Sequence, residues 1–213
     1  MGREFLDLFE NWAHTYDTTV NGQDTEYKEV FVRYDQILEA VTNKSGLVVL
    51  EFGVGTGNLT QKLIVSGKKV YGIEPSAPMR EKALNKLSAD ALLADGDFIS
   101  FPKPLEDIDT IVSTYAFHHL TDNEKNQAIS SYSNLLKKNG KIVFADTVFV
   151  DEFAHKQMIK KATQQNYFNL AKDLETEYYT TLSVLKTIFE DNGFTVTFTQ
   201  MNDFVWLSEA VKK

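Results

Sequence analysis

The strongest constraint on the fold is a short apolar segment that runs into three alternating glycines. Residues 48–52 are apolar except for Glu51, and Gly53, Gly55 and Gly57 complete the pattern E-x-G-x-G-x-G. The apolar run is too short for a helix and predicts a buried strand. Glycines let the chain turn sharply and bring backbone close to a ligand, at the positive end of the next helix. We therefore expect a nucleotide-type binding turn, with a turn that binds nothing as the alternative.

The spacing of the glycines narrows the class of ligand. A dinucleotide fingerprint requires its third glycine at the position of Asn58, one residue later than Gly57. A phosphate-gripping loop requires a Lys and a Ser or Thr after its last glycine, and Asn58 and Leu59 stand there instead. The carboxylate of Glu51 would also repel a pyrophosphate at close range. The pattern therefore favours a ligand that carries positive charge.

Acidic residues end the next two expected strands. Glu74 ends the segment 69–74 and follows Gly53 by 21 residues, the distance at which an acid on the second strand reaches a ribose. Its carboxylate can accept hydrogen bonds from two neighbouring hydroxyls. Asp97 and Phe98 follow the third segment and can bracket an adenine, with the carboxylate on the amino group and the ring on the base. A solvated Glu and a plain Asp-Gly turn are the alternatives.

Strand and helix patterns alternate from about residue 47 to 146, which predicts an open, mostly parallel sheet with helices on both faces. The fold class is therefore α/β, a Rossmann-like three-layer sandwich with a seven-stranded sheet. Its last two strands are joined by only a few residues, which forces an antiparallel hairpin. Ligands of such sheets bind at the carboxyl ends of the strands. The expected strands are 48–52, 69–74, 91–94, 109–114, 141–145, 194–198 and 204–207.

Helical patterns precede and follow the core of this sheet. An apolar stripe near the N-terminus predicts a helix that packs, or that lies over the site and puts the Tyr16 hydroxyl on the ligand. A second helix is expected over residues 27–41, and residues 152–190 have helical character. The N-terminal stripe consists of Phe5, Leu6, Leu8, Phe9 and Trp12.

Composition excludes several classes of function. The chain has 213 residues and no cysteine, so it has neither disulfides nor thiolate catalysis, in keeping with a reducing cytoplasm. A net charge of −8 without a run of Lys or Arg disfavours nucleic acid as a partner. The N-terminus is not a signal peptide, and no window approaches the ~20 apolar residues of a membrane span. We expect a cytoplasmic protein with no membrane partner.

Five features in this order resemble the class I S-adenosylmethionine-dependent methyltransferases. They are E-x-G-x-G-x-G, the second-strand acid, Gly-Asp-Phe at 96–98, Phe-His-His-Leu at 117–120 and the terminal hairpin. The resemblance covers about residues 45–207 and is closest to small uncharacterised bacterial methyltransferases of the YrrT type. The segment with Trp12, Tyr16 and Asp17 is similar to the lid of many members.

The resemblance implies one methyltransferase domain over residues 1–213. Its parts would be a helical lid (1–44), a cofactor-binding core (45–150), a helical insertion (151–192) and the hairpin (193–213). It also implies S-adenosylmethionine as cofactor, S-adenosylhomocysteine as product, a small-molecule methyl acceptor, and a monomer or homodimer. The glycines would border the methionine portion, Glu74 the ribose and Asp97 with Phe98 the adenine, while Glu51 lies near the ammonium group. The implied cofactor-binding residues are Tyr16, Glu51, Gly53, Gly55, Gly57, Glu74, Asp97 and Phe98.

His118 and His119 are the candidate catalytic residues. A sulfonium methyl is already activated, so a base is needed only if the acceptor must lose a proton, and a histidine at the mouth of the site suits that role. If the segment is extended, adjacent side chains diverge and at most one, with His118 favoured, faces the substrate. The same divergence argues against a metal site. Packing or helix capping by one histidine, a nicotinamide oxidoreductase, and a binding module without catalysis are the alternatives.

Overall fold

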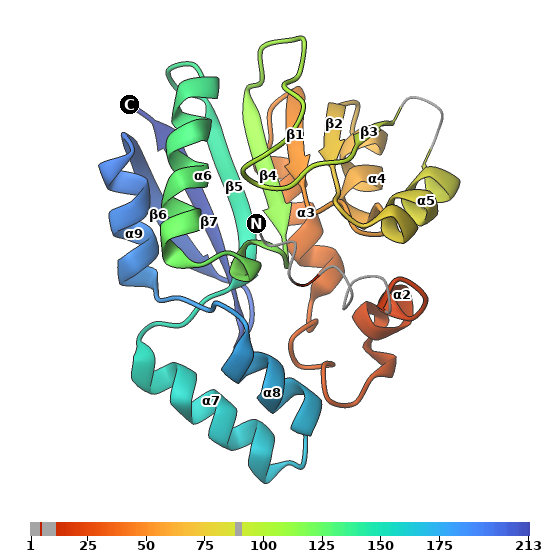
Figure 1. Ribbon diagram of the computed structural model, residues 1–213, viewed down its shortest axis with the longest axis vertical. Helices are drawn as coiled ribbons and strands as arrows, with labels where there is room; N and C mark the ends of the chain where they lie inside the picture. The colour runs from red at the N-terminus through yellow and green to blue at the C-terminus, as the bar shows by residue number, and fades with distance from the viewer. Residues whose placement is uncertain (1–4, 6–11, 88–90) are drawn as a thin grey trace.

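A seven-stranded sheet forms the centre of the computed structural model, which describes residue 5, residues 12–87 and residues 91–213 (Figure 1). The strands lie in the order β3-β2-β1-β4-β5-β7-β6, and the expected seven-stranded sheet is confirmed. The strands are β1 (Val48–Phe52), β2 (Lys69–Ile73), β3 (Leu92–Ala94), β4 (Thr110–Thr114), β5 (Lys141–Thr147), β6 (Phe194–Gln200) and β7 (Val205–Lys212).

The sheet is parallel from β1 to β5 and ends in an antiparallel hairpin. β1 pairs in parallel with β2 and β4, while β7 pairs antiparallel with both β5 and β6. The turn between β6 and β7 is closed by Asn202, whose Oδ1 accepts hydrogen bonds from the N–H groups of Phe204 and Val205 at 2.8 and 2.7 Å. A join this short permits only an antiparallel pair, so the expected hairpin is confirmed.

Helices cover both faces of the sheet, which confirms the three-layer architecture (Figure 1). Successive strand residues point to opposite faces. Val49 accordingly packs in one apolar cluster with Ile37 and Leu63 from the helices of one face, and Leu50 packs in a second cluster with Tyr132 from the other. The covering helices are α3 (Tyr34–Lys44) and α4 (Asn58–Val65) on the first face and α6 (Asp122–Leu135) and α9 (Leu182–Asp191) on the second, while α5 (Ala77–Lys86) follows β2.

A further group of helices lies beyond the carboxyl ends of the strands (Figure 1). α8 contributes Leu170 and Leu174 to the same apolar cluster as Val20 and Phe31 of the N-terminal segment. These segments, far apart in the sequence, therefore pack together over the edge of the sheet at which a ligand is expected. The elements are α2 (Tyr16–Thr18), the π-helical turn η2 (Thr19–Gln23), α7 (Glu152–Gln164) and α8 (Phe168–Thr176).

Two helix expectations need correction. The helix expected over residues 27–41 begins only at Tyr34, because Arg33 has a φ of 64° and breaks the helical path, and turns occupy residues 27–33. The helical region 152–190 consists of three separate helices. Leu6, Leu8 and Phe9 of the N-terminal stripe lie outside the described residues.

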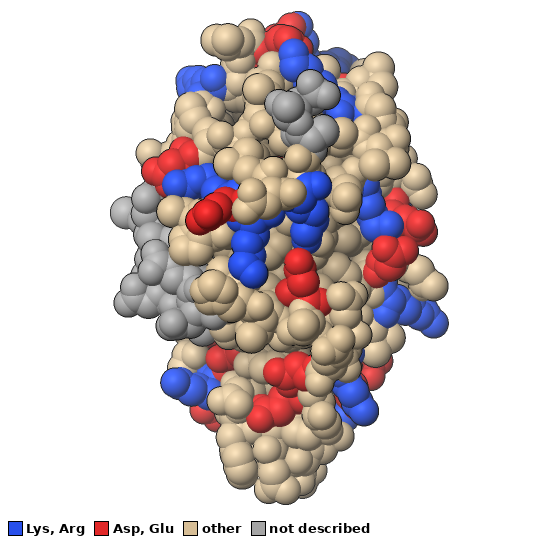
Figure 2. All heavy atoms as spheres, turned by 90° about the vertical axis from the view of Figure 1, so that its right-hand side faces the viewer, with Lys and Arg blue, Asp and Glu red and all other residues tan. Residues whose placement is uncertain are grey.

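Basic and acidic side chains are interspersed on the face shown in Figure 2, and neither sign gathers into one large patch there. The chain as a whole carries a net charge of −8. None of the helices in the described part of the chain combines the length and the apolar character that a bilayer crossing requires.

Candidate active site

The glycine turn joins the carboxyl end of β1 to the N-terminus of α4. Gly53, Gly55 and Gly57 have φ angles of 68°, 56° and 85°, in the left-handed region that side chains with a Cβ rarely adopt. A side chain at Gly53 would also clash, because a Cβ there would lie 2.7 Å from the Cβ of Ala116. The turn therefore needs glycine for its backbone path and, at Gly53, for the close approach of the loop after β4.

A cavity lies beside this turn, over the carboxyl ends of β1, β2 and β4; we call it the first cavity. Seven of the residues predicted from the sequence line it, whereas Glu51, Gly57 and His118 are not among its lining residues. The strand ends therefore bring most of the predicted site together. The seven are Tyr16, Gly53, Gly55, Glu74, Asp97, Phe98 and His119.

Backbone amides hold the two carboxylates of the first cavity. Glu74 accepts hydrogen bonds from the N–H of Gly55 at Oε2 and from that of Ser76 at Oε1, each at 2.8 Å. Asp97 Oδ1 accepts from the amides of residues 99 and 100 at 2.9 and 2.8 Å. Burial raises the pKa of Glu74 despite these amide bonds. A carboxylate has about four lone-pair sites, so Glu74 retains the capacity to accept from a ligand.

The charge of the first cavity is negative. Glu74 and Asp97 are 4% and 7% exposed, and no Lys or Arg is found among the described residues that line the cavity. A pyrophosphate would meet two carboxylates and no cation here, whereas a positively charged nucleoside would be attracted. The electrostatics agree with the expectation from the sequence.

Glu51 lies in β1 just before the glycine turn and is 1% exposed. The Thr60 hydroxyl donates a hydrogen bond to Glu51 Oε2 at 2.7 Å. Burial raises the pKa of Glu51 to about 8, and the charge of Glu74 adds to the shift while the bond from Thr60 opposes it. Glu51 is therefore largely protonated at neutral pH in this state, and a cation nearby would favour its ionised form.

The N-terminal segment is fastened to the glycine turn by Asp17. Its carboxylate accepts hydrogen bonds from the Thr56 hydroxyl at 2.6 Å and from the Asn58 side-chain amide at 3.2 Å, and it pairs with the Lys86 ammonium at 2.9 Å. The neighbouring Tyr16 thereby lies against the first cavity. The segment expected to act as a lid thus has a polar attachment to the turn.

A second cavity adjoins the first and shares Tyr16, Met79, Tyr115 and His119 with it. Its other walls come from the N-terminal segment, from α8 and from the loop before α9. Most of these residues are aromatic or aliphatic, and Asp173 and Glu177 are acidic. The remaining lining residues are Trp12, Tyr27, Val30, Phe31, His118, Thr147, Leu170, Asp173, Leu174, Glu177, Tyr179 and Phe204.

Tyr115 marks the junction of the two cavities. It has a φ of 52°, which is uncommon for a residue with a side chain. Its hydroxyl is buried and has no hydrogen-bond partner among the described residues. Buried polar groups are nearly always satisfied, and backbone strain is concentrated at functional sites. Both observations make Tyr115 a candidate for contact with a ligand.

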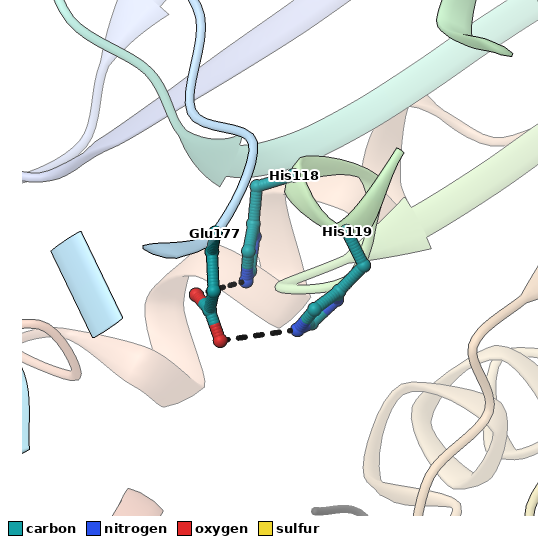
Figure 3. A group of neighbouring side chains, drawn as sticks. All are labelled: His118, His119 and Glu177. Carbon is teal, nitrogen blue, oxygen red and sulfur yellow. Dashed lines mark ion pairs between the residues drawn. The ribbon is translucent and has the colours of Figure 1, made fainter. Parts of the chain in front are cut away.

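The two histidines converge, contrary to the expectation from an extended segment. Residues 117–119 form the 3₁₀ turn η3 (Phe117–His119), and the rings of His118 and His119 lie 4.1 Å apart. Glu177, from the loop after α8, faces both rings: its Oε2 is 3.4 Å from His118 Nε2 and its Oε1 is 3.5 Å from His119 Nε2 (Figure 3). The segment is not extended, so divergence of the two rings no longer argues against a metal site here.

Neighbouring charges shift the pKa values of His118, His119 and Glu177 in different directions. Burial lowers the pKa of His118, but the charge of Asp146 and its hydrogen bond to Nδ1 at 2.5 Å outweigh burial, and the net shift is upward. Burial and the charge of His118 lower the pKa of His119. Burial opposes ionisation of Glu177, yet the bond from His119 and the charges of both histidines bring its pKa down to about 2.

Comparison with known proteins identifies the family. Residues 49–140 match a family model described as a methyltransferase domain. Over 213 residues the chain is 62% identical to an uncharacterised methyltransferase of Geobacillus sp. (strain WCH70), with 100% of both chains covered. A relative from Bacillus thuringiensis (strain Al Hakam), also an uncharacterised methyltransferase, is 60% identical with the same coverage. This chain belongs to the class I S-adenosylmethionine-dependent methyltransferases.

Solved structures share the fold of this methyltransferase. The magnesium protoporphyrin IX methyltransferase of Synechocystis PCC 6803 with bound S-adenosylhomocysteine is 20% identical with a TM-score of 0.68, over 89% of this chain and 88% of that one. A methyltransferase of Thermotoga maritima, described as a possible histamine N-methyltransferase, is 17% identical with a TM-score of 0.66, over 98% and 99%.

The cofactor of this methyltransferase is S-adenosylmethionine, and the chemistry of the first cavity's lining suits a molecule of that charge. A sulfonium and an ammonium group give it positive charge, and it has no phosphate. The carboxylates of Glu74 and Asp97, the absence of Lys and Arg from the described lining and the open backbone at Gly55, where a Cβ would meet nothing within 4 Å, all agree with such a ligand.

Sequence reasoning missed two residues beside the predicted site, Glu177 and Lys86. Glu177 lies about 60 residues beyond the histidines in a loop, and no periodic pattern marks it. Lys86 is one of many lysines by sequence, and nothing in its position marks it as the partner of Asp17. Tyr115, an aromatic residue directly after β4, lies where the sequence already suggests a partly aromatic pocket.

Proposed function

We propose that this methyltransferase transfers a methyl group from S-adenosylmethionine in the first cavity to a small-molecule acceptor in the second, by in-line displacement, and releases S-adenosylhomocysteine. The observation that carries the proposal is the shared wall of the two cavities, where Tyr16, Met79, Tyr115 and His119 face both. Displacement needs the reacting atoms about 3–3.5 Å apart and in line. Two adjoining cavities provide such a contact between two ligands.

The chain's own residues suggest how the cofactor is held. Gly53, Gly55 and Gly57 would border its methionine portion, and Glu74 would accept from the ribose hydroxyls with the lone pairs that its amide bonds leave. Asp97 and Phe98 would hold the adenine, and Tyr16 would close the cavity from the lid. Glu51 would place negative charge beneath the ammonium group. When bound, S-adenosylmethionine supplies a methyl group on a positively charged sulfur, already activated for displacement.

The second cavity supports an acceptor with an apolar or aromatic body. Its walls are mainly aromatic and aliphatic. Tyr115 presents a hydroxyl without a partner among the described residues, which would bind a polar group of either ligand at the junction. The net charge of −8 disfavours a nucleic-acid acceptor, so we favour a small metabolite.

Of the two candidate catalytic residues, we assign the contact with the acceptor to His119. His119 lines both cavities, whereas His118 lines only the second of the two and is held by Asp146. The lowered pKa of His119 also leaves its ring neutral near pH 7, the form in which it can take up a proton. This assignment reverses the preference for His118 that the sequence suggested.

The test is methyl transfer itself. The protein is incubated with S-adenosylmethionine and pools of small amines, phenols, thiols and carboxylic acids, and S-adenosylhomocysteine is quantified. We expect turnover with at least one class and a loss of about 10²-fold or more in His119→Ala, with cofactor affinity retained. Binding of S-adenosylmethionine without turnover in any pool would instead support a binding module without catalysis.

A further inference from the structure

The spacing within the group His118, His119 and Glu177 is unusual for a hydrogen-bonded cluster. The two Nε2···Oε separations of 3.4 and 3.5 Å exceed the 2.7–2.9 Å of charge-assisted hydrogen bonds (Figure 3). Two ligand atoms that each lie about 2.1 Å from a tetrahedral cation are about 3.4 Å apart. The three ligand atoms all lie within 4.8 Å of one another. Each of the two separations therefore matches one edge of a tetrahedral site, with Glu177 facing His118 through Oε2 and His119 through Oε1.

Each side chain of the group is held by a further hydrogen bond. His118 Nδ1 bonds with Asp146 Oδ1 at 2.5 Å, and His119 Nδ1 with the carbonyl oxygen of Ala116 at 3.0 Å. The Tyr179 hydroxyl donates to Glu177 Oε2 at 2.5 Å. Metal-binding histidines typically donate Nδ1–H to a carboxylate or a carbonyl oxygen, which directs the Nε2 lone pair at the cation. Both histidines have this arrangement.

His119 makes two polar contacts, one of 3.0 Å from Nδ1 to the carbonyl oxygen of Ala116 and one of 3.5 Å from Nε2 to Glu177 Oε1. The second contact is the longer of the two. A cation between His119 Nε2 and Glu177 would replace it with two coordination bonds.

The charges around the group favour a cation. Asp146 Oδ1 lies 2.5 Å from His118 Nδ1, and the carboxyl groups of Glu177 and Asp173 line the second cavity. The ammonium of Lys125, whose charge acts on His118, is engaged by the carbonyl oxygens of Leu120 and Tyr178. The side chains of the three candidate ligands are at most 10% exposed, so their attraction for a cation is only weakly screened by solvent.

We propose that His118, His119 and Glu177 bind one divalent transition-metal cation, with zinc the best fit, whose remaining coordination position opens into the second cavity. Two imidazoles and one carboxylate suit zinc and its transition-metal neighbours, whereas magnesium and calcium prefer oxygen ligands. Three protein ligands leave a position open, as in catalytic zinc sites. The open position would take a donor atom of the methyl acceptor.

This role at the acceptor rests on the proposed function, whereas metal binding does not. A cation would take the His119 lone pair that a general base would use. Activation of the acceptor would then pass from proton removal by His119 to coordination, in which the metal lowers the pKa of the bound donor atom. The loss of turnover expected for His119→Ala holds in either case.

Metal binding is tested by removing metal from the full chain with a chelator and titrating it with zinc against a chromophoric chelator. We expect one zinc per chain, binding at least 10-fold weaker in Glu177→Gln and His119→Ala, and no comparable binding of magnesium. Asp146→Asn should weaken binding 10- to 100-fold by disorienting His118. The chain has four histidines, and His14→Ala and His155→Ala are the controls that should bind zinc as the unaltered protein does.

A second measurement uses only the unaltered protein, so that it does not depend on the folding of a variant. X-ray absorption of the zinc-loaded chain should show two imidazole ligands and at least one oxygen ligand. Absence of zinc binding, a ligand shell without imidazole, or loss of binding in His14→Ala or His155→Ala would overturn the proposal. Binding of S-adenosylhomocysteine to the metal-free protein is measured in parallel, because its loss would count against the proposed function instead.

Discussion

Replacing Glu74 by alanine tests the assignment of the ribose to the first cavity. The carboxylate lines the first cavity and accepts the N–H groups of Gly55 and Ser76 at 2.8 Å, one at each oxygen, so each oxygen retains a lone pair. Two hydroxyls on neighbouring ribose carbons would occupy these lone pairs. Glu74→Ala removes both acceptors at once.

The expected loss follows from the energy of hydrogen bonds to a charged group, about 1.5–3 kcal/mol. This loss corresponds to roughly 10- to 100-fold weaker binding of S-adenosylhomocysteine, measured by titration calorimetry. The free energy of unfolding should also fall by about 1–3 kcal/mol, because two amide donors lose their acceptor. Urea denaturation measures this second effect separately, so an affinity change can be distinguished from a folding defect.

Asp95→Ala is the matched control. Asp95 follows β3 as Glu74 follows β2, and it pairs with Arg80 at 3.2 Å, but it does not line the first cavity. Loss of this carboxylate should leave the affinity within about twofold of the unaltered protein, since exposed pairs contribute little. A folded Glu74→Ala protein with unchanged affinity for S-adenosylhomocysteine would refute the assignment of Glu74.

Three further changes probe the turn and the buried carboxylates. Gly53→Ala should lower the free energy of unfolding by about 2–4 kcal/mol in urea, because its methyl meets Ala116 and its φ is positive, whereas Gly193→Ala, at a φ of 85° in open space, should cost about 1 kcal/mol. The pKa of Glu177 is held near 2, so its ionised form stabilises the folded protein by roughly 3 kcal/mol above its ordinary pKa of 4.5. The free energy of unfolding should fall by this amount as the pH falls from 4.5 toward 2. Glu177→Gln should reduce this dependence of stability on pH. Glu51, with its pKa raised to about 8, should lose its proton when the cationic cofactor binds at pH 7, so the calorimetric enthalpy should vary with the ionisation enthalpy of the buffer, and Glu51→Gln should abolish that dependence.

Local signals predicted the glycine turn and the strands. The alternating glycines reflect left-handed backbone at Gly53, Gly55 and Gly57, a requirement of single residues that a sequence displays directly. Glu74 and Asp97 were also placed correctly beside the turn, because parallel strands bring their carboxyl ends to one edge of the sheet whatever the details of packing.

The features that the sequence did not predict depend on tertiary packing. The convergence of His118 and His119 depends on the 3₁₀ turn after Tyr115, whose positive φ has no glycine to announce it. Glu177 reaches the histidines only because α7 and α8 fold over the strand ends. Arg33 breaks a helix whose apolar spacing continues across the break, so periodicity alone extended that helix too far.

The central claim, that the first cavity selects a positively charged nucleoside cofactor by its carboxylates, is tested most directly by calorimetry on the unaltered protein. S-adenosylmethionine, S-adenosylhomocysteine and NAD are titrated into the same preparation. We predict one site per chain with micromolar affinity for the first two and no measurable binding of NAD. Binding of NAD with equal or higher affinity, or no binding of S-adenosylmethionine by the folded protein, would contradict the claim.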